Sequence, residues 1–276
     1  MSTIATNIAS LKTLYNLQKN ENGYTDAVER LSSGLRINKA GDDAAGAAIV
    51  NRMTSQIAGM NVAIRNAGDA ISMSQVAEGA LHEVSEVLQR MRELAVQAAS
   101  GISSNNDKDY LNLEMKQLVQ QVDAISSNTK FNDRALLTGD TFTFYTDIDV
   151  AGTAITTTGA DMAASALAVS AVTVSIGGAV AQTALSNVVS AIDNALATVD
   201  NRRAALGAVS NRFNHVIDNL QNVVMNTVAS QSRIVDADYA VETTELTRNT
   251  VLQQAATAML AQANAQKNSI LALIQQ

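Results

Sequence analysis

Residues 57–98 read IAGMNVAIRNAGDAISMSQVAEGALHEVSEVLQRMRELAVQA, and their apolar residues recur in steps of three and four. The first series consists of Ile57, Met60, Ile64, Ala67 and Ile71, ending at Ser74. After a shift of one position, the second consists of Ala77, Leu81, Val84, Leu88, Met91, Ala95 and Ala98. Such steps place residues on one helix face, and their repetition over several heptads is typical of helices that pack lengthwise. The stretch therefore predicts a long helix in a bundle.

Further segments repeat the helical spacing. Ser100-Gly101 ends the long helix, and residues 103–107 form a predicted polar turn. A shorter helix follows, with one face made of Leu111, Met115, Leu118, Val122 and Ile125. The spacing returns at Leu185 and continues towards Ile234. The predicted fold class is mainly α, an antiparallel bundle of long helices in which 46–140 and 185–234 form the core domain.

The middle of the chain has a different composition, and residues 135–201 contain no Lys or Arg. Phe142 and Phe144 alternate with threonines, and 172–176 alternate in the same way, which is the period of a strand. We expect 141–184 to form a short surface-exposed insertion, a small β-hairpin appendage of one or two hairpins joined by a loop of small residues.

Residues 162–192 carry no charge and are long enough to span a bilayer. A membrane-inserting translocator is therefore one alternative. The stretch is mostly Ala, Ser, Thr, Gly and Val, however, with Gln182 and Asn187 inside it. This hydropathy is weak for a transmembrane helix, so we expect no membrane insertion.

Both ends of the chain carry narrow apolar seams and little charge. Isolated helices are marginal in water and gain stability from packing. We therefore expect 1–45 and 235–276 to be disordered in the monomer and to form coiled-coil-type N/C-terminal helix pairs once partners arrive. The residues expected to make the polymer contacts are Ile4, Ile8, Leu11, Leu252, Met259, Ile270 and Leu273.

Composition excludes several classes of protein. The chain has 276 residues, with 19 Lys and Arg against 26 Asp and Glu, so its net charge is −7. An acidic chain lacks the basic face of a general nucleic-acid binder. The absence of Cys rules out disulfides, and the absence of Pro leaves long helices uninterrupted. The sequence begins MSTIATN, without a basic region and apolar core, so we expect no cleaved signal peptide.

Several longer motifs, in order at both ends, resemble one family. Near the N-terminus they are 29–38 (ERLSSGLRIN), 42–46 (DDAAG), 66–72 (NAGDAIS), 78–81 (EGAL) and 89–97 (QRMRELAVQ). Near the C-terminus they are 206–213 (LGAVSNRF), 232–240 (SRIVDADYA), 252–255 (LQQA), 260–264 (LAQAN) and 271–274 (LALI). This pattern is similar to that of the bacterial flagellins and covers roughly residues 1–140 and 185–276.

The resemblance implies a structural role: a subunit that polymerises with copies of itself into an extracellular flagellar filament for motility. It also implies export as an unfolded chain, a flagellar export chaperone, a filament cap protein and hook-associated junction proteins as partners. A hook–filament junction protein, which has similar terminal helices, is the alternative nearest to flagellin. The full motifs at both ends favour flagellin.

The residue types in 31–43 predict a local structure, a helix end followed by a connector and a helix cap. Gly34 is suited to end a helix, residues 38–43 to form a polar connector, and Asp42 and Asp43 to cap the next helix. The resemblance implies that this connector, with Arg36, Asn38, Asp42 and Asp43, joins the terminal helices to the core. The chain departs from the family at Lys39-Ala40-Gly41, where the basic residue is shifted, and in its very short middle.

Two sets of residues suggest functions other than polymerisation. His82-Glu83-Val84-Ser85-Glu86 begins like a zinc-protease motif, but Glu86 stands where the second His is needed. We therefore expect no enzyme activity, no metal and no cofactor, and we read these charges as an exposed helix face. The resemblance also implies that four core residues match the surface recognised by the host Toll-like receptor 5: Gln89, Arg90, Leu94 and Glu114.

Overall fold

The computed structural model describes residues 6–100, 104–146, 154–170 and 179–274. It divides into two compact units, one made of residues 1–57 and 225–276 and the other of residues 58–224. Both divisions fall inside continuous helices, α2 (Ala44–Ala98) and α4 (Ala179–Val235). The domain boundaries expected from the sequence, at 45/46 and 234/235, lie instead near the connectors between the helices. Those boundaries remain a prediction.

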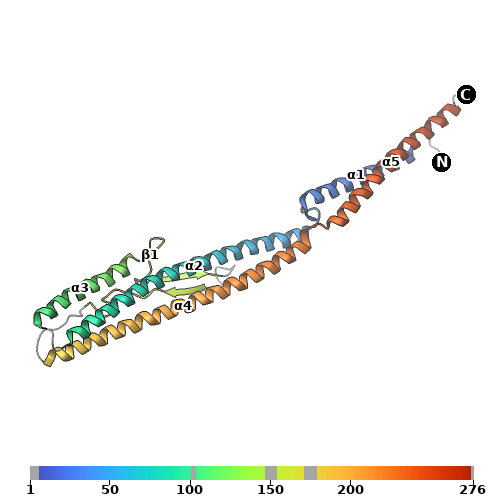
Figure 1. Ribbon diagram of the computed structural model, residues 1–276. Coiled ribbons are helices and arrows are strands. Elements are labelled where there is room, and N and C mark those ends of the chain that lie inside the picture. Colours follow the sequence, from blue (N-terminus) through green and yellow to red (C-terminus); the bar gives the residue numbers. More distant parts are fainter. Residues whose placement is uncertain (1–5, 101–103, 147–153, 171–178, 275–276) are drawn as a thin grey trace. The chain divides into compact units, whose positions relative to one another are not determined.

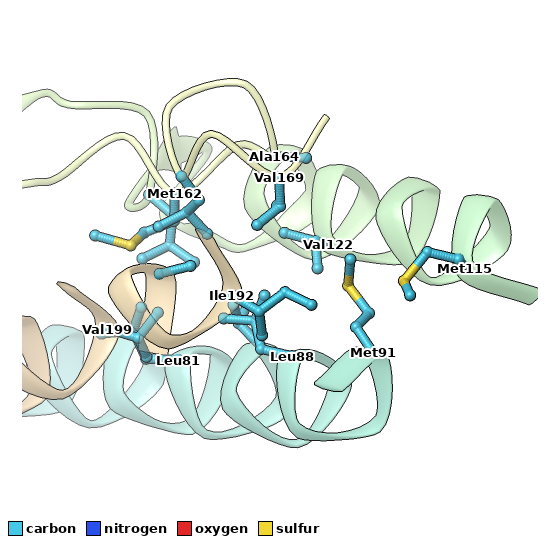
Figure 2. Packing of buried hydrophobic residues seen from close by; sticks show 14 of the residues in the cluster. Leu81, Leu88, Met91, Met115, Val122, Met162, Ala164, Val169, Ile192 and Val199 are labelled. Carbon is cyan, nitrogen blue, oxygen red and sulfur yellow. The ribbon is translucent and has the colours of Figure 1, made fainter. Parts of the chain in front are cut away.

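The unit of residues 58–224 is a bundle of α2, α3 (Asn105–Asn128) and α4 with two small hairpins (Figure 1). Apolar side chains from all three helices meet in one core (Figure 2). Those buried most completely are Leu81, Leu88 and Met91 of α2, Met115 and Val122 of α3, and Ile192 and Val199 of α4. The second series, from Ala77 to Ala98, faces this core, and Ala67 and Ile71 of the first pack in a separate cluster with Phe213. This burial confirms the predicted mainly α bundle.

The predicted turn at 103–107 is too long, because α3 already begins at Asn105. Ser104 is its N-cap: the Ser104 hydroxyl accepts from the Asp107 backbone N–H at 3.2 Å, and the Asp107 carboxylate accepts from the Ser104 N–H at 2.9 Å. The Ser104 hydroxyl also donates to the Asp107 carboxylate at 2.7 Å, and this bond, followed by that from the Ser104 backbone N–H, lowers the pKa of Asp107. The pair is a capping box, which ends the turn and starts the helix.

Two antiparallel hairpins follow α3. β1 (Lys130–Phe131) pairs with β2 (Arg134–Ala135) across Asn132 and Asp133, which both have positive φ, as a tight two-residue turn requires. The sequence reading missed this hairpin. β3 (Thr141–Tyr145) pairs with β4 (Ala154–Thr158), so the strand predicted at Phe142 and Phe144 is confirmed. Its partner is 154–158, whereas 172–176 lie outside the described residues.

The expectation that 141–184 lies at the surface is wrong for much of the segment. Ile155, Met162, Ala164 and Val169 are fully buried, and Figure 2 shows the last three beside the core residues of the helices. Backbone groups anchor this stretch, since the Met162 N–H donates to the Leu137 carbonyl at 3.0 Å. Low charge and small residues suggested a loop, but these residues supply apolar surface that covers the bundle core.

The unit of residues 1–57 and 225–276 contains α1 (Ile8–Ser33) and α5 (Tyr239–Ile274), which pair side by side as antiparallel helices (Figure 1). At one end, the Asn7 side-chain amide donates to the Ala263 carbonyl at 3.1 Å. At the other, Arg30 and Glu242 form an ion pair at 3.2 Å. The predicted N/C-terminal helix pairing is thus confirmed.

Among the described helices, none combines the length and apolar character that crossing a bilayer requires.

Candidate assembly surface

The face of α1 that packs against α5 is made mostly of small or polar side chains. Ala27 is buried, and the partly buried residues that continue its face are Ser10, Thr13, Leu17, Asn20 and Gly23. Ile8 and Leu11 are 63% and 55% exposed, and Tyr15 is more exposed still. These three recur at helical spacing on the side of α1 away from that seam. These three large apolar residues of α1 therefore face outward, whereas Leu17 lies in the seam.

The face of α5 towards α1 has the same character. Its buried and partly buried members, at alternating steps of three and four, are Glu242, Leu246, Asn249, Gln253, Ala256, Leu260 and Ala263. Leu252 and Met259, seven residues apart on a neighbouring face, are 42% and 62% exposed. Of the predicted polymer contacts, Ile4 and the side chains of Ile270 and Leu273 lie outside the described residues.

A shallow groove of about 520 Å³ lies along α5, lined by Thr243, Thr244, Thr247, Arg248, Val251 and Leu252. The threonine hydroxyls do not need an outside partner. Each of Thr243, Thr244 and Thr247 donates at 2.8 Å to the backbone carbonyl four residues earlier in its own helix. Because their hydroxyls are satisfied, these side chains can be covered by another helix without leaving a buried donor unpaired.

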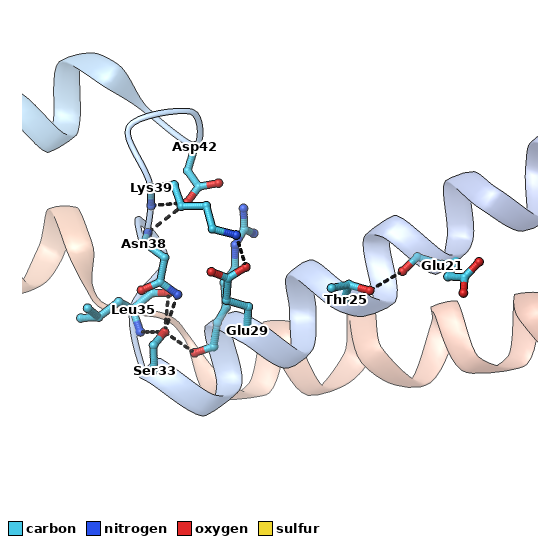
Figure 3. Close-up of polar contacts among 9 residues, drawn as sticks. Glu21, Thr25, Glu29, Ser33, Leu35, Asn38, Lys39 and Asp42 are labelled. Carbon is cyan, nitrogen blue, oxygen red and sulfur yellow. Dashed lines mark hydrogen bonds and ion pairs between the residues drawn. The ribbon is translucent and has the colours of Figure 1, made fainter.

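The connector between α1 and α2 is held by its own hydrogen bonds (Figure 3). Gly34, with φ of 72°, ends α1 and donates its N–H to the Arg30 carbonyl at 2.8 Å. The Ser33 hydroxyl oxygen accepts from the Leu35 N–H at 3.1 Å and from the Asn38 amide at 2.7 Å. Helix end and connector are thus joined through one side chain, as the positive φ at a C-terminal glycine allows.

Asp42 and Asp43 have different roles, which corrects the expectation that both cap α2. Asp43 is the cap, since its carboxylate accepts the Gly46 N–H at 2.9 Å. The Asp42 carboxylate instead accepts the backbone N–H groups of Lys39 and Asn38, each at 2.9 Å. These two bonds lower the pKa of Asp42 and close the connector into a turn.

The shifted basic residue has a partner within the chain. The Lys39 ammonium lies 2.6 Å from the Glu29 carboxylate of α1, and this hydrogen bond raises the pKa of Lys39. Both side chains are solvated, so the pair contributes little to stability. Its effect is to place the connector against the end of α1.

Arg36 and Gly34 tie the connector to the break between α4 and α5. The Arg36 N–H donates to the Val235 carbonyl at 2.6 Å, and the Ala237 N–H donates to the Gly34 carbonyl at 2.9 Å. The Arg36 guanidinium also donates to the Ile234 carbonyl at 2.6 Å. The chain passes between its long helices twice, and the structure joins the two passages through these bonds.

The four residues expected from the resemblance to form a receptor surface are only partly together. The Arg90 guanidinium donates to Glu114 at 3.0 Å and to Glu93 at 3.1 Å, and these bonds raise the pKa of Arg90. Gln89, Arg90 and Glu114 are exposed, but Leu94 is fully buried in the bundle core. Leu94 therefore belongs to the packing of α2 and cannot line that surface in this structure.

The zinc-like motif forms an exposed pair, with the His82 imidazole 3.7 Å from the Glu86 carboxylate. Within the described residues, no group of three His, Asp or Glu side chains could hold a metal ion.

Sequence reasoning missed Glu242, the only buried charged residue of the described chain. Its position in the three-and-four repeat of α5 was the available signal.

Residues 4–141 match the model of the bacterial flagellin N-terminal helical region, and residues 189–274 match that of the C-terminal helical region. The chain is 42% identical to a flagellin of Halalkalibacterium halodurans, over 97% of this chain and 98% of the relative.

It is also 39% identical to a flagellin of Bacillus subtilis, over 97% and 98% of the two chains. A flagellar filament core protein of Treponema maltophilum is 38% identical over 90% of this chain and 91% of the relative. The crystal structure of Bacillus cereus flagellin matches 56% of this chain and 88% of its own, with 28% identity and a TM-score of 0.48.

Proposed function

The chain belongs to the bacterial flagellins, the structural subunits of the motile flagellar filament, and we propose that the outward apolar side chains of α1 and α5 make its polymer contacts. One observation supports this assignment. Ile8, Leu11, Leu252 and Met259 are all exposed, although they are among the largest apolar residues of these helices. They are the residues that covering by another subunit would stabilise most.

Burial of these side chains would stabilise the proposed contact. A large apolar side chain is worth about 1.5–3 kcal/mol when it passes from water into a packed contact. In a helical polymer each subunit presents one surface to a different surface of the next, so the contacts never close and the fibre grows. A few exposed side chains on each subunit then contribute at every step of growth. We assign Ile4, Ile270 and Leu273 to the same contacts from the sequence.

The test is polymerisation of a Leu11→Asp variant. A charge at a contact that becomes dry is costly, so the critical concentration for filament growth rises at least tenfold. Asn16→Asp, at an exposed polar position of the same helix outside the face of Ile8, Leu11 and Tyr15, is the matched control and leaves it nearly unchanged. Melting of the 58–224 unit, followed by circular dichroism, stays the same in both. An unchanged critical concentration in Leu11→Asp would remove α1 from the interface.

The proposal also names specific partners for the filament subunit. An export chaperone, a filament cap protein and hook-associated junction proteins follow from the family motifs at both ends, and co-purification with the C-terminal residues 235–276 tests the chaperone. Export without a cleaved signal peptide is tested by the N-terminal sequence of secreted protein. For Toll-like receptor 5, exposed Gln89, Arg90 and Glu114 are the contacts proposed, and loss of receptor binding in Arg90→Glu is the measurement.

A further inference from the structure

The seam between α1 and α5 is unusual in the side chains that it buries. Helix pairs of the coiled-coil type normally bury large apolar residues at the positions that face each other. Here the seam contains Asn20 and, on α5, Glu242, Asn249 and Gln253, among alanines and a few leucines. Alanines and leucines that repeat every seven residues pack about as well after a shift of seven, so they do not define one register.

The first polar contact would be lost by such a shift. The Glu242 side chain is 9% exposed, and its carboxylate lies 3.2 Å from the Arg30 guanidinium. Glu242 is in the first turn of α5 and Arg30 is in the last turn of α1, so each charge also lies at the favourable end of its helix. Moving α5 by one heptad would separate the pair and leave a buried carboxylate without its partner, which is strongly unfavourable.

The second contact depends on a glycine. The side chain of Asn249 lies over Gly23, so close that a Cβ on Gly23 would be 2.9 Å from the Asn249 Nδ2. A shift of one heptad replaces Gly23 with Asn16 or Arg30, whose side chains occupy that space. At the far end, the Asn7 amide donates to the Ala263 carbonyl. All three contacts, spread along both helices, occur in the same antiparallel register, but only the first two specify it, because another α5 carbonyl could accept from Asn7 after a shift.

We propose that the polar side chains of this seam, Glu242 with Arg30 and Asn249 over Gly23, set the register of α1 on α5. A single polar residue in a helix seam is known to fix register at a cost in stability, because only one alignment satisfies it. The register decides where the outward residues of α1 stand relative to those of α5. The pairing is within one chain, so the proposal holds whether or not these faces make the polymer contacts.

The experiment measures the register directly. The chain has no Cys, so Asn22→Cys and Gln262→Cys, both at exposed positions, carry the only two spin labels. Their separation along the pair changes by about 10 Å when α5 shifts by seven residues, at 1.5 Å per residue. The distance is measured in the soluble chain and in filaments that contain the labelled chain as a minor fraction.

The seam variant is Glu242→Gln with Asn249→Leu, and Glu242→Gln alone is a milder form. Gln254→Leu, an exposed position of α5, is the matched control. We expect one distance in the parent and in the control, and a second distance displaced by about 10 Å in the seam variant. A single unshifted distance in the seam variant would overturn the proposal. A broad distribution there would overturn it too, since the polar residues would then hold the helices together rather than align them.

Discussion

At the scale of single residues, the hydroxyl of Thr157 on β4 is buried without a hydrogen-bond partner. An unpaired buried hydroxyl costs about 1–3 kcal/mol, and Val has the same shape without it. Thr157→Val should therefore stabilise the 58–224 unit by about 1 kcal/mol in thermal unfolding. Thr156→Val, on the exposed side of the same strand, is the control and should change little. Destabilisation by Thr157→Val alone would show that the hydroxyl has a partner after all.

At the scale of elements, residues 162–169 are part of the bundle core rather than a dispensable loop. Leu167 is buried against the helices, whereas Leu113 of α3, in the same unit, is 59% exposed. Leu167→Ala should cost about 2–5 kcal/mol of unfolding free energy, because the removed atoms leave a cavity. Leu113→Ala makes the same chemical change at the surface and should cost much less. Denaturant unfolding of both variants measures the difference, and equal losses would mean that residues 162–169 pack differently.

The helices that the sequence predicted share one property, which is a long periodic signal. The series from Ile57 to Ala98 repeats often enough to identify α2 and its buried face. β1 and β2 have two residues each, too short for any period, and only the pair Asn132-Asp133 marked their turn. β4 was missed because its run of threonines resembles a loop, and its pairing with β3 is decided by contacts distant in sequence.

At the scale of the whole molecule, apolar spacing selected the proposed contact residues of the terminal helices but did not orient them. Apolar spacing grouped Ile8 with Leu11 correctly, yet it could not say whether their face meets α5 or the solvent. That choice depends on both helices at once, since Gly23 and Ala27 allow a close approach that bulky side chains would prevent. The same limit applies to Leu94, whose burial depends on α3 and α4 packing around α2.

The distribution of buried side chains between the two units predicts how the soluble chain is digested. Among described residues, all of the largest fully buried side chains lie in 58–224, whereas the terminal unit buries Ile37, Glu242 and a few small residues. Little apolar burial means that the terminal helices open at a low free-energy cost. In the soluble chain, trypsin should cut at Lys19 and Arg248, and then at Lys39 and Arg233, well before Arg92, leaving a fragment near residues 46–234.

In filaments the same sites should resist if, as proposed, polymer contacts cover the outward faces of α1 and α5. The control is the rate of cutting at Arg92 in the 58–224 unit, which should be slow in both states. Mass spectrometry of timed digests measures the order of the cuts. Equal rates at Lys19 and Arg92 in the soluble chain would show that the terminal helix pair is as stable as the bundle. Its outward apolar residues would then bind a partner as a preformed surface, without folding during assembly.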